Sequence, residues 1–191
     1  MTDSELRDAL ELHHSESYGW ALNCCVRSSV DAEAVLQTVY LKALMGKARY
    51  HGKASFKTWL FAVIRRTAAD ERRRQILRRL LLDRFQASPP RTPIEQPDEA
   101  VHRIELQRLV REALTQLPRR QREVLQLVFY HDLSLAEAAQ VMNVSLGSAR
   151  THYERGKKRL RRQMEGWQIH YEARIGREDD QRIVSASEAG R

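Results

Sequence analysis

The stretch Leu133–Leu160 constrains the fold most, because its pattern predicts two short helices joined by a tight turn. Ser134 and Glu137 have the spacing of a capping box at the start of the first helix. Asn143 is a residue type that tolerates the left-handed turn conformation, and Ser145 can cap a second helix. The sequence therefore predicts a helix-turn-helix.

The predicted second helix has one packing side and one polar side. The packing side carries Leu146, Ala149, Tyr153, Gly156 and Leu160. The polar side carries Gly147, Ser148, Thr151, Arg155, Lys158 and Arg159, with Arg150 on its flank. Small hydrogen-bonding residues followed by cations suit the major groove of DNA, where side chains reach base edges and phosphates. The alternative interpretation is an ordinary helical hairpin with a solvated basic face.

The charge balance favours an anionic partner, since 33 Lys and Arg against 25 Asp and Glu give a net charge of +8. The excess is clustered in two runs. One lies within Arg65–Arg79 and the other within Arg155–Arg162. A charge run alone is more often a solvated face, so the runs support DNA binding only beside the helix-turn-helix.

Several residue patterns argue against other classes of protein. The neighbouring Cys24 and Cys25 lack CxxC spacing and lie in an apolar stretch, which indicates core thiols in a reducing compartment. The seven histidines are scattered, so we expect no metal site and no cofactor. No apolar run is long enough to cross a membrane, and the N-terminus does not resemble a signal peptide. We therefore expect a cytoplasmic protein without membrane insertion.

Three helical regions are predicted before residue 85. The first follows a possible capping box at Thr2. Asp31 is predicted to cap the second, which leaves Glu33, Gln37 and Lys42 facing outward. A polar connection, Gly46–Ser55, leads to a third helix that Ser55 is predicted to cap.

The third helix places an aromatic residue on its predicted outer face. Its inward stripe is predicted to be Phe56, Trp59, Leu60, Val63, Ile64 and Thr67. The outer face then contains Phe61, with Arg65 one turn later. An exposed aromatic beside a cation is typical of proteins that stack an unpaired base. The alternative from these residues alone is that another helix covers Phe61.

The pattern predicts an all-α protein of two small helical lobes joined by a flexible linker. The N-terminal lobe covers residues 1–84, and the C-terminal lobe with the helix-turn-helix covers residues 99–164. The linker, residues 85–98, contains Pro89, Pro90, Pro93 and Pro97. Residues 165–191 are mostly polar and are predicted to be a partly disordered tail.

Both predicted lobes resemble the extracytoplasmic-function (ECF) sigma factors of bacterial RNA polymerase. The resemblance lies in DAEAVLQTVYLKAL (Asp31–Leu44), SFKTWLFAVIRRTAADERRR (Ser55–Arg74) and the stretch Leu117–Leu160, in that order. It implies that the N-terminal lobe binds the polymerase clamp and melts the promoter −10 element. It also implies that the C-terminal lobe reads the −35 element and that an anti-sigma factor holds the protein inactive.

The resemblance assigns roles to individual positions of this chain. The −35 contacts would be Gly147, Ser148, Arg150, Thr151, Arg155 and Lys158. The −10 contacts would be Tyr50, His51, Gly52, Lys53, Lys57, Phe61, Arg65 and Arg66, with the loop receiving a flipped base. The clamp contacts would be Asp31, Glu33, Gln37 and Lys42. The chain departs from the family pattern at Ala34, Thr38, His152 and Glu154, so the preferred promoter sequence cannot be copied from a relative.

Two other classes of function were weighed against this one. A stand-alone helix-turn-helix regulator would need only the C-terminal lobe and leaves the N-terminal lobe unexplained. An enzyme would need converging acid, base or metal residues, and the sequence has no Ser-His-Asp spacing, glycine-rich phosphate loop or metal cluster. The expected partners are core RNA polymerase, promoter DNA and an anti-sigma factor.

Overall fold

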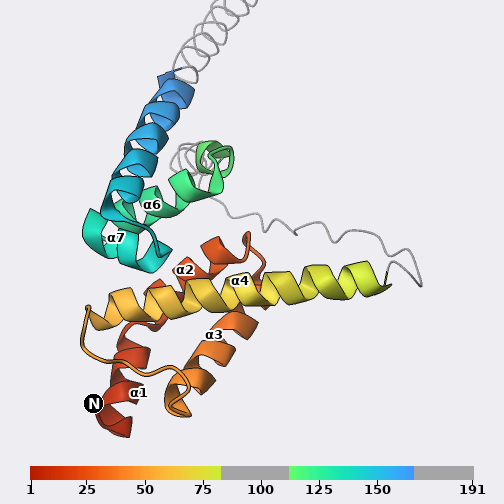
Figure 1. Cartoon of the computed structure of the whole chain (residues 1–191), viewed down its shortest axis with the longest axis vertical. Helices are drawn as coiled ribbons and strands as arrows, with labels where there is room; N and C mark the ends of the chain where they lie inside the picture. Colours follow the sequence, from red (N-terminus) through yellow and green to blue (C-terminus); the bar gives the residue numbers. More distant parts are fainter. Residues whose placement is uncertain (83–111, 166–191) are drawn as a thin grey trace, which may run out of the picture. The chain divides into compact units, whose positions relative to one another are not determined.

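The computed structural model describes residues 1–82 and 112–165, and every regular element in these two ranges is an α-helix (Figure 1). The predicted all-α class is therefore confirmed. The chain divides into two compact units, residues 1–98 with 126–150 and residues 99–125 with 151–191. The predicted linker 85–98 and nearly all of the predicted tail lie outside the described residues, and the domain boundaries stay a prediction.

Three of the four helices in residues 1–82 begin where a local side chain satisfies a free N–H group; α2 has no such side-chain cap. The helices of residues 1–82 are α1 (Asp3–Leu12), α2 (His14–Cys24), α3 (Ser29–Leu44) and α4 (Phe56–Leu82). Thr2 and Glu5 form the predicted capping box of α1. Ser55 Oγ accepts from Thr58 N at 3.2 Å, which confirms the predicted cap of α4. The predicted cap Asp31 is wrong, because Ser28 caps α3 and accepts from the Asp31 amide.

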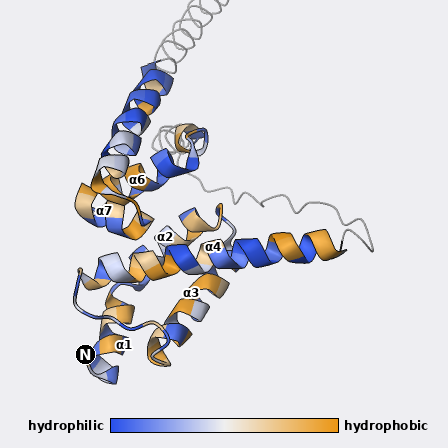
Figure 2. Cartoon of the chain, in the orientation of Figure 1, coloured by the Kyte–Doolittle hydropathy of each residue, from blue (hydrophilic) through white to orange (hydrophobic). Residues whose placement is uncertain are grey.

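The core of this unit lies where α2, α3 and α4 pack against one another. Trp20 of α2, Val35 and Val39 of α3, and Leu60 and Ile64 of α4 are fully buried or nearly so. Burying each aliphatic side chain of this size contributes about 1.5–3 kcal/mol. Towards the C-terminal end of α4 the apolar residues return to the surface, as the orange segment in Figure 2 shows. They are Ile76, Leu77, Leu80 and Leu81.

The helix-turn-helix is formed as predicted. The helix α6 (Arg119–Phe129) precedes it, and α7 (Leu135–Met142) is its first helix. Ser134 and Glu137 form the capping box of α7, and Asn143 ends it in the left-handed conformation with φ 52° and ψ 54°. Ser145 Oγ accepts from the Ser148 amide at 3.2 Å and caps the second helix, 146–165. Each predicted local signal of this motif is confirmed.

Gly156 lets the helix 146–165 approach α6 closely. A Cβ atom at Gly156 would lie 3.1 Å from Leu125 Cδ1 and 3.3 Å from Gln121 Cβ. The second of these neighbours is anchored to the backbone of α6 and has little freedom to retreat. By contrast, a Cβ atom at Gly147 meets nothing within 4 Å. The two glycines of one helix therefore stand in opposite environments.

We predict that Gly156→Ala destabilises the protein and that Gly147→Ala stabilises it. Alanine favours a helix interior by about 1 kcal/mol over glycine, and this value is the upper bound of the gain at Gly147, which lies in the first turn of its helix. At Gly156 the overpacking costs about 1–3 kcal/mol and outweighs that gain. Chemical denaturation of the two variants and the wild type measures both changes. A Gly156→Ala protein as stable as Gly147→Ala would show that α6 and this helix are not closely packed.

Candidate nucleic-acid interface

The predicted −35 residues share an exposed helix face. The side of the helix 146–165 that packs includes the fully buried Ala149 and Gly156. The residues predicted to contact DNA are all exposed, namely Gly147, Ser148, Arg150, Thr151, Arg155 and Lys158. The prediction that Leu146 packs is wrong, because its side chain is exposed. The helix face predicted to contact DNA is thus accessible along its whole length.

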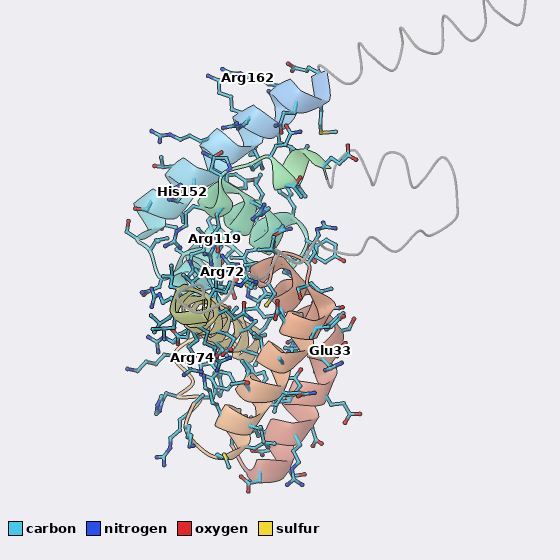
Figure 3. All side chains as sticks on the ribbon, turned by 90° about the vertical axis from the view of Figure 1, so that its right-hand side faces the viewer. Glu33, Arg72, Arg74, Arg119, His152 and Arg162 are labelled. Carbon is cyan, nitrogen blue, oxygen red and sulfur yellow. The ribbon has the colours of Figure 1, made fainter. Side chains whose placement is uncertain are left out.

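The basic residues of this helix extend past its predicted DNA face. Arg159, Arg161 and Arg162 are exposed, and Figure 3 shows Arg162 extending away from the helix. Lys157 Nζ lies 5.1 Å from the centre of the Tyr153 ring, in the range of a cation–π contact. This arrangement creates a positive surface that can attract a phosphate backbone, while Ser148 and Thr151 supply hydrogen-bonding groups.

The predicted −10 loop is folded back on the start of α4. His51, Gly52 and Lys53 are exposed, whereas Tyr50 is half-buried and donates from its hydroxyl to the Ala54 carbonyl at 2.7 Å. Gly52 has φ +70°, a conformation that favours glycine. The loop is therefore held at one end and presents its three exposed residues at the turn.

An aromatic cluster anchors this loop, and sequence reasoning did not identify it. The Tyr50 ring lies 5.4 Å from Phe56 and 5.6 Å from Trp59, measured between ring centres. Phe56 and Trp59 lie 5.1 Å apart, and His13 of α2's N-terminal cap stacks on Phe56 at 5.9 Å. The helical spacing predicted that Phe56 and Trp59 face the core, but both are half-buried beneath the loop. A signal was present in the i, i+3 spacing of these two aromatic residues and in Tyr50 close before them.

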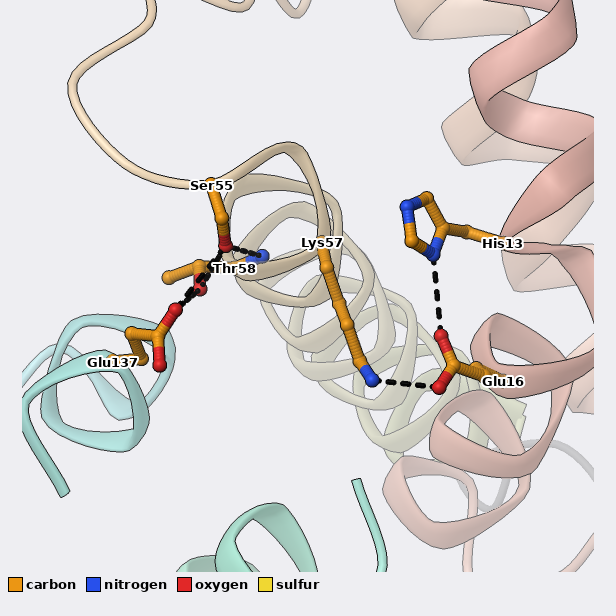
Figure 4. Close-up of polar contacts among 6 residues, drawn as sticks. All are labelled: His13, Glu16, Ser55, Lys57, Thr58 and Glu137. Atoms are coloured by element: carbon orange, nitrogen blue, oxygen red, sulfur yellow. Dashed lines mark hydrogen bonds and ion pairs between the residues drawn. The ribbon is translucent and has the colours of Figure 1, made fainter. Parts of the chain in front are cut away.

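The prediction that Phe61 lies on an exposed face is wrong. Its side chain is fully buried. The Trp20 ring stacks on it at 5.8 Å with an interplanar angle of 11°, and the His131 ring meets it edge-on at 4.8 Å. Thr58, three residues earlier on the same helix, is also buried, and its hydroxyl donates to Glu137 Oε1 at 3.2 Å (Figure 4). The alternative weighed from the sequence, that another part of the chain covers Phe61, describes the observed environment.

The cations near Phe61 differ in their surroundings. Lys57 Nζ contacts Glu16 Oε1 at 2.6 Å and lies 5.8 Å from the centre of the Phe61 ring. Burial alone would raise the pKa of Glu16, but hydrogen bonds from Lys57 and His13 outweigh it and lower that pKa. Arg66 is exposed, and Arg65 is half-buried. Lys57 is thus committed to an ion pair, while Arg66 faces solvent.

The predicted clamp residues of α3 divide into two groups. Glu33 and Gln37 are exposed (Glu33 is labelled in Figure 3). Asp31 Oδ1 accepts from Gln75 Nε2 at 3.1 Å, and Lys42 Nζ donates to Thr67 Oγ1 at 3.2 Å. The prediction that Lys42 faces outward is wrong, because it is half-buried against α4. Asp31 and Lys42 therefore join α3 to α4.

A second apolar stripe on α3 escaped the sequence analysis. Val30, Leu41 and Leu44 are exposed and lie in line with Glu33 and Gln37 at helical spacing, Val30 before them and the two leucines after them. The helical spacing of these residues was present in the sequence, but the regular inward stripe already accounted for the helical period of this segment. Together these five residues form the α3 outer face, an apolar surface with polar residues at its middle.

His131 is a buried neutral histidine. Burial lowers its pKa to about 4, the Lys57 charge acts in the same direction, and Glu16 and Asp132 partly oppose them. The Trp20 ring meets it edge-on at 5.8 Å. His131 is only 3% exposed, so protonation of its ring would create a positive charge that water cannot hydrate.

The sequence predicts neither a metal site nor a membrane span, and the structure bears on both in residues 1–82 and 112–165. Within these ranges no group of three or more His, Cys, Asp or Glu side chains could hold a metal ion. No helix of the same ranges is both long and apolar enough to cross a membrane. Cys24 and Cys25 are not joined in a disulfide, and burial, followed by the Asp31 charge, raises the pKa of Cys25 to about 11. Cys25 is therefore a protonated, unreactive thiol.

These features define an all-α DNA-binding protein with a helix-turn-helix, and the comparisons assign its family. Residues 10–78 match the family model for Sigma-70 region 2, and residues 107–160 match the model for Sigma-70 region 4. The chain is 30% identical over 183 residues to the ECF RNA polymerase sigma factor SigX of Bacillus subtilis, covering 93% of this chain and 94% of SigX. It is 25% identical to SigW of the same organism, covering 70% of this chain and 75% of SigW. The chain belongs to the ECF RNA polymerase sigma factors.

Solved structures agree with this fold. The sigma factor RpoE of Bartonella quintana, solved in complex with the anti-sigma factor NepR, is similar with a TM-score of 0.64 and 20% identity. The match covers 84% of this chain and 97% of RpoE. CnrH, solved with the cytosolic domain of CnrY, has a TM-score of 0.59 and 20% identity over 86% of this chain and 90% of CnrH. Membership of this family confirms the predicted function, that of a non-enzymatic transcription initiation factor. It supports this function over the two alternatives, a stand-alone regulator and an enzyme.

The buried His131 makes the fold sensitive to mild acid. An unfolded histidine titrates near 6.5, so the unfolded chain binds this proton more tightly than the folded one. The stability contributed by neutral His131 is complete above about pH 6.5 and is lost as the pH falls towards 4. We expect the urea midpoint to fall between pH 7 and pH 5, and less steeply in His131→Gln. Parallel slopes for the two proteins would show that His131 is hydrated in the folded state.

Proposed function

We propose that the chain binds core RNA polymerase, reads a −35 element with the helix 146–165 and opens the −10 element with the loop and α4. The observation that carries this proposal is that six predicted DNA contacts, from Gly147 to Lys158, are all exposed on one basic helix. Bases would be read by Thr151 and Arg155, and phosphates would be held by Lys158. His51, Gly52, Lys53 and Arg66 are exposed and available to a displaced strand.

The proposed polymerase contact is the α3 outer face. It combines the exposed Leu41 and Leu44 with Glu33 and Gln37, and an exposed apolar patch with polar residues is typical of a protein interface. Asp31 and Lys42 have a supporting role in this proposal, because they fix α3 on α4. The protein would act in the cytoplasm, where polymerase and promoters are.

An anti-sigma factor is the proposed regulator. The solved relatives RpoE and CnrH were captured with NepR and with the cytosolic domain of CnrY, respectively. In this chain the α3 outer face and the basic helix 146–165 are exposed surfaces that an inhibitor could mask. Co-purification from the host under non-inducing conditions tests this expectation, and recovery of polymerase alone would count against it.

Run-off transcription with purified core polymerase tests the main proposal. The full chain should direct initiation from promoters recovered by sequencing DNA bound to the holoenzyme. The chain without core polymerase should bind the same duplexes poorly. Sequence-specific binding of the free chain, without any polymerase-dependent transcription, would favour a stand-alone regulator.

We predict two kinds of loss for substitutions on the recognition helix. Arg155→Ala should weaken −35 recognition by about 1–3 kcal/mol, the usual worth of a contact to a base edge, and Thr151→Ala should do the same. Lys158→Ala should weaken binding to all sequences and reduce the salt dependence. Holoenzyme binding to templates with and without the −35 element, over a range of salt concentrations, separates these effects. Unchanged promoter use by Arg155→Ala would contradict the assigned helix face.

We also predict that Leu41→Ala weakens polymerase binding without unfolding the protein. Leu41 is 57% exposed, so its removal should cost the fold little, whereas an interface would lose a buried side chain worth about 1–3 kcal/mol. Leu77→Ala on α4 is the matched control, because Leu77 is 59% exposed. Competition for fluorescent core polymerase measures both. Equal binding by the two variants would remove the α3 outer face from the proposed interface.

A further inference from the structure

A carboxylate lies among the cations of the recognition helix, 146–165. Glu154 is exposed and comes three residues after Thr151 and four before Lys158. At 100° per residue it lies between Arg150 and Lys158 around the helix axis, so it belongs to the face predicted to contact DNA. The helical period therefore places one negative charge on a face that otherwise carries cations and small polar residues.

No ion pair within the protein accounts for this carboxylate. Arg150 precedes Glu154 by four residues and Lys158 follows it by four, the spacing at which ion pairs form on a helix. Among the residues that the structure describes, 1–82 and 112–165, neither cation forms an ion pair with Glu154. On a face that meets DNA this charge repels phosphates, so Glu154 aids binding only where it gains a contact to a base.

The major groove of DNA offers a carboxylate only two kinds of hydrogen-bond donor. Cytosine presents its N4 amino group, and adenine presents its N6 amino group beside the N7 acceptor. Guanine and thymine present acceptor atoms, which repel a carboxylate. Cytosine is the base that suits Glu154 best, because the second carboxylate oxygen then meets no neighbouring acceptor on the same base.

We infer that Glu154 is a specificity-determining residue, which accepts a hydrogen bond from the N4 amino group of a cytosine in the −35 element. This inference rests on the proposed function, because it requires the recognition helix to lie in the major groove. Glu154 lies about 4.5 Å along the helix axis from Thr151, whereas base pairs are spaced by about 3.4 Å. The cytosine should therefore lie one or two base pairs from the pair that Thr151 contacts.

Selection from randomised −35 elements tests this inference, with the full chain bound to core polymerase. Promoter duplexes with random bases in this element are bound by the holoenzyme, and the bound DNA is sequenced. The wild type should select a C·G pair at one position about fivefold over the other pairs, near the lower limit for a contact to a base edge. Glu154→Gln should select an A·T pair at the same position, because glutamine forms two hydrogen bonds with adenine N6 and N7. Glu154→Ala should lose the preference at that position alone.

Glu165→Gln is the matched control for the change in charge. Glu165 is the other acidic residue of this helix, is exposed, and lies about three turns beyond Glu154. Both substitutions to glutamine remove one negative charge, so both should raise the affinity for all sequences. Glu165→Gln should nevertheless select the same bases as the wild type, because it lies beyond the predicted base contacts.

The selected sequences separate the inference from the proposed function. If both Glu154 variants select the same bases as Glu165→Gln, Glu154 is a solvated residue and the inference is wrong. A wild-type preference other than cytosine at the position altered by Glu154→Gln would also contradict it. A wild-type holoenzyme that selects no bases in this element would overturn the proposed function, and this inference with it.

Discussion

The Trp20 indole is the constraint on which the first unit depends. Its Nε1 donates to the Phe61 carbonyl at 3.0 Å, and its ring stacks on the Phe61 side chain. Both residues are fully buried, so the hydrogen bond satisfies an indole N–H that would otherwise be left without a partner. The same pair thus fixes the position of α2 along α4, the helix that follows the predicted −10 loop.

This constraint explains why α4 has two packed sides over its first half. Leu60 and Ile64 face the core of the three helices, and Phe61 and Thr58 are covered by Trp20, His131 and α7. Beyond Ala68 the helix is mostly exposed, and its arginines alternate with Ile76, Leu77, Leu80 and Leu81. A helical-wheel projection of the whole helix assumes that one inner face runs along its full length. It therefore cannot represent the change along α4 from two packed sides to an exposed surface.

The predictions that succeeded were those that depend on neighbours in the sequence. The capping boxes, the left-handed Asn143 and the exposed face of the recognition helix follow from local chemistry. The predictions that failed for Phe61, Lys42 and Leu146 depend on which segment lies opposite. The Asp31 cap is a local failure, because Ser28, three residues earlier, also has a capping side chain and takes that role. Phe61 is covered by residues 41 and 70 positions away in the chain, at Trp20 and His131. A helical period indicates that a face is apolar, but it does not identify its partner.

Glu137 couples local folding of the helix-turn-helix to its contact with α4. Its pKa is lowered chiefly by the hydrogen bond from the Ser134 amide, then by the Ser134, Thr58 and Ser55 hydroxyls. Because the capping oxygen holds the carboxylate in place, the second oxygen is already oriented toward Thr58 and little further side-chain entropy is lost on docking. The hydrogen bonds that cap α7 do not involve α4, so the two roles of Glu137 are divided between its two carboxylate oxygens.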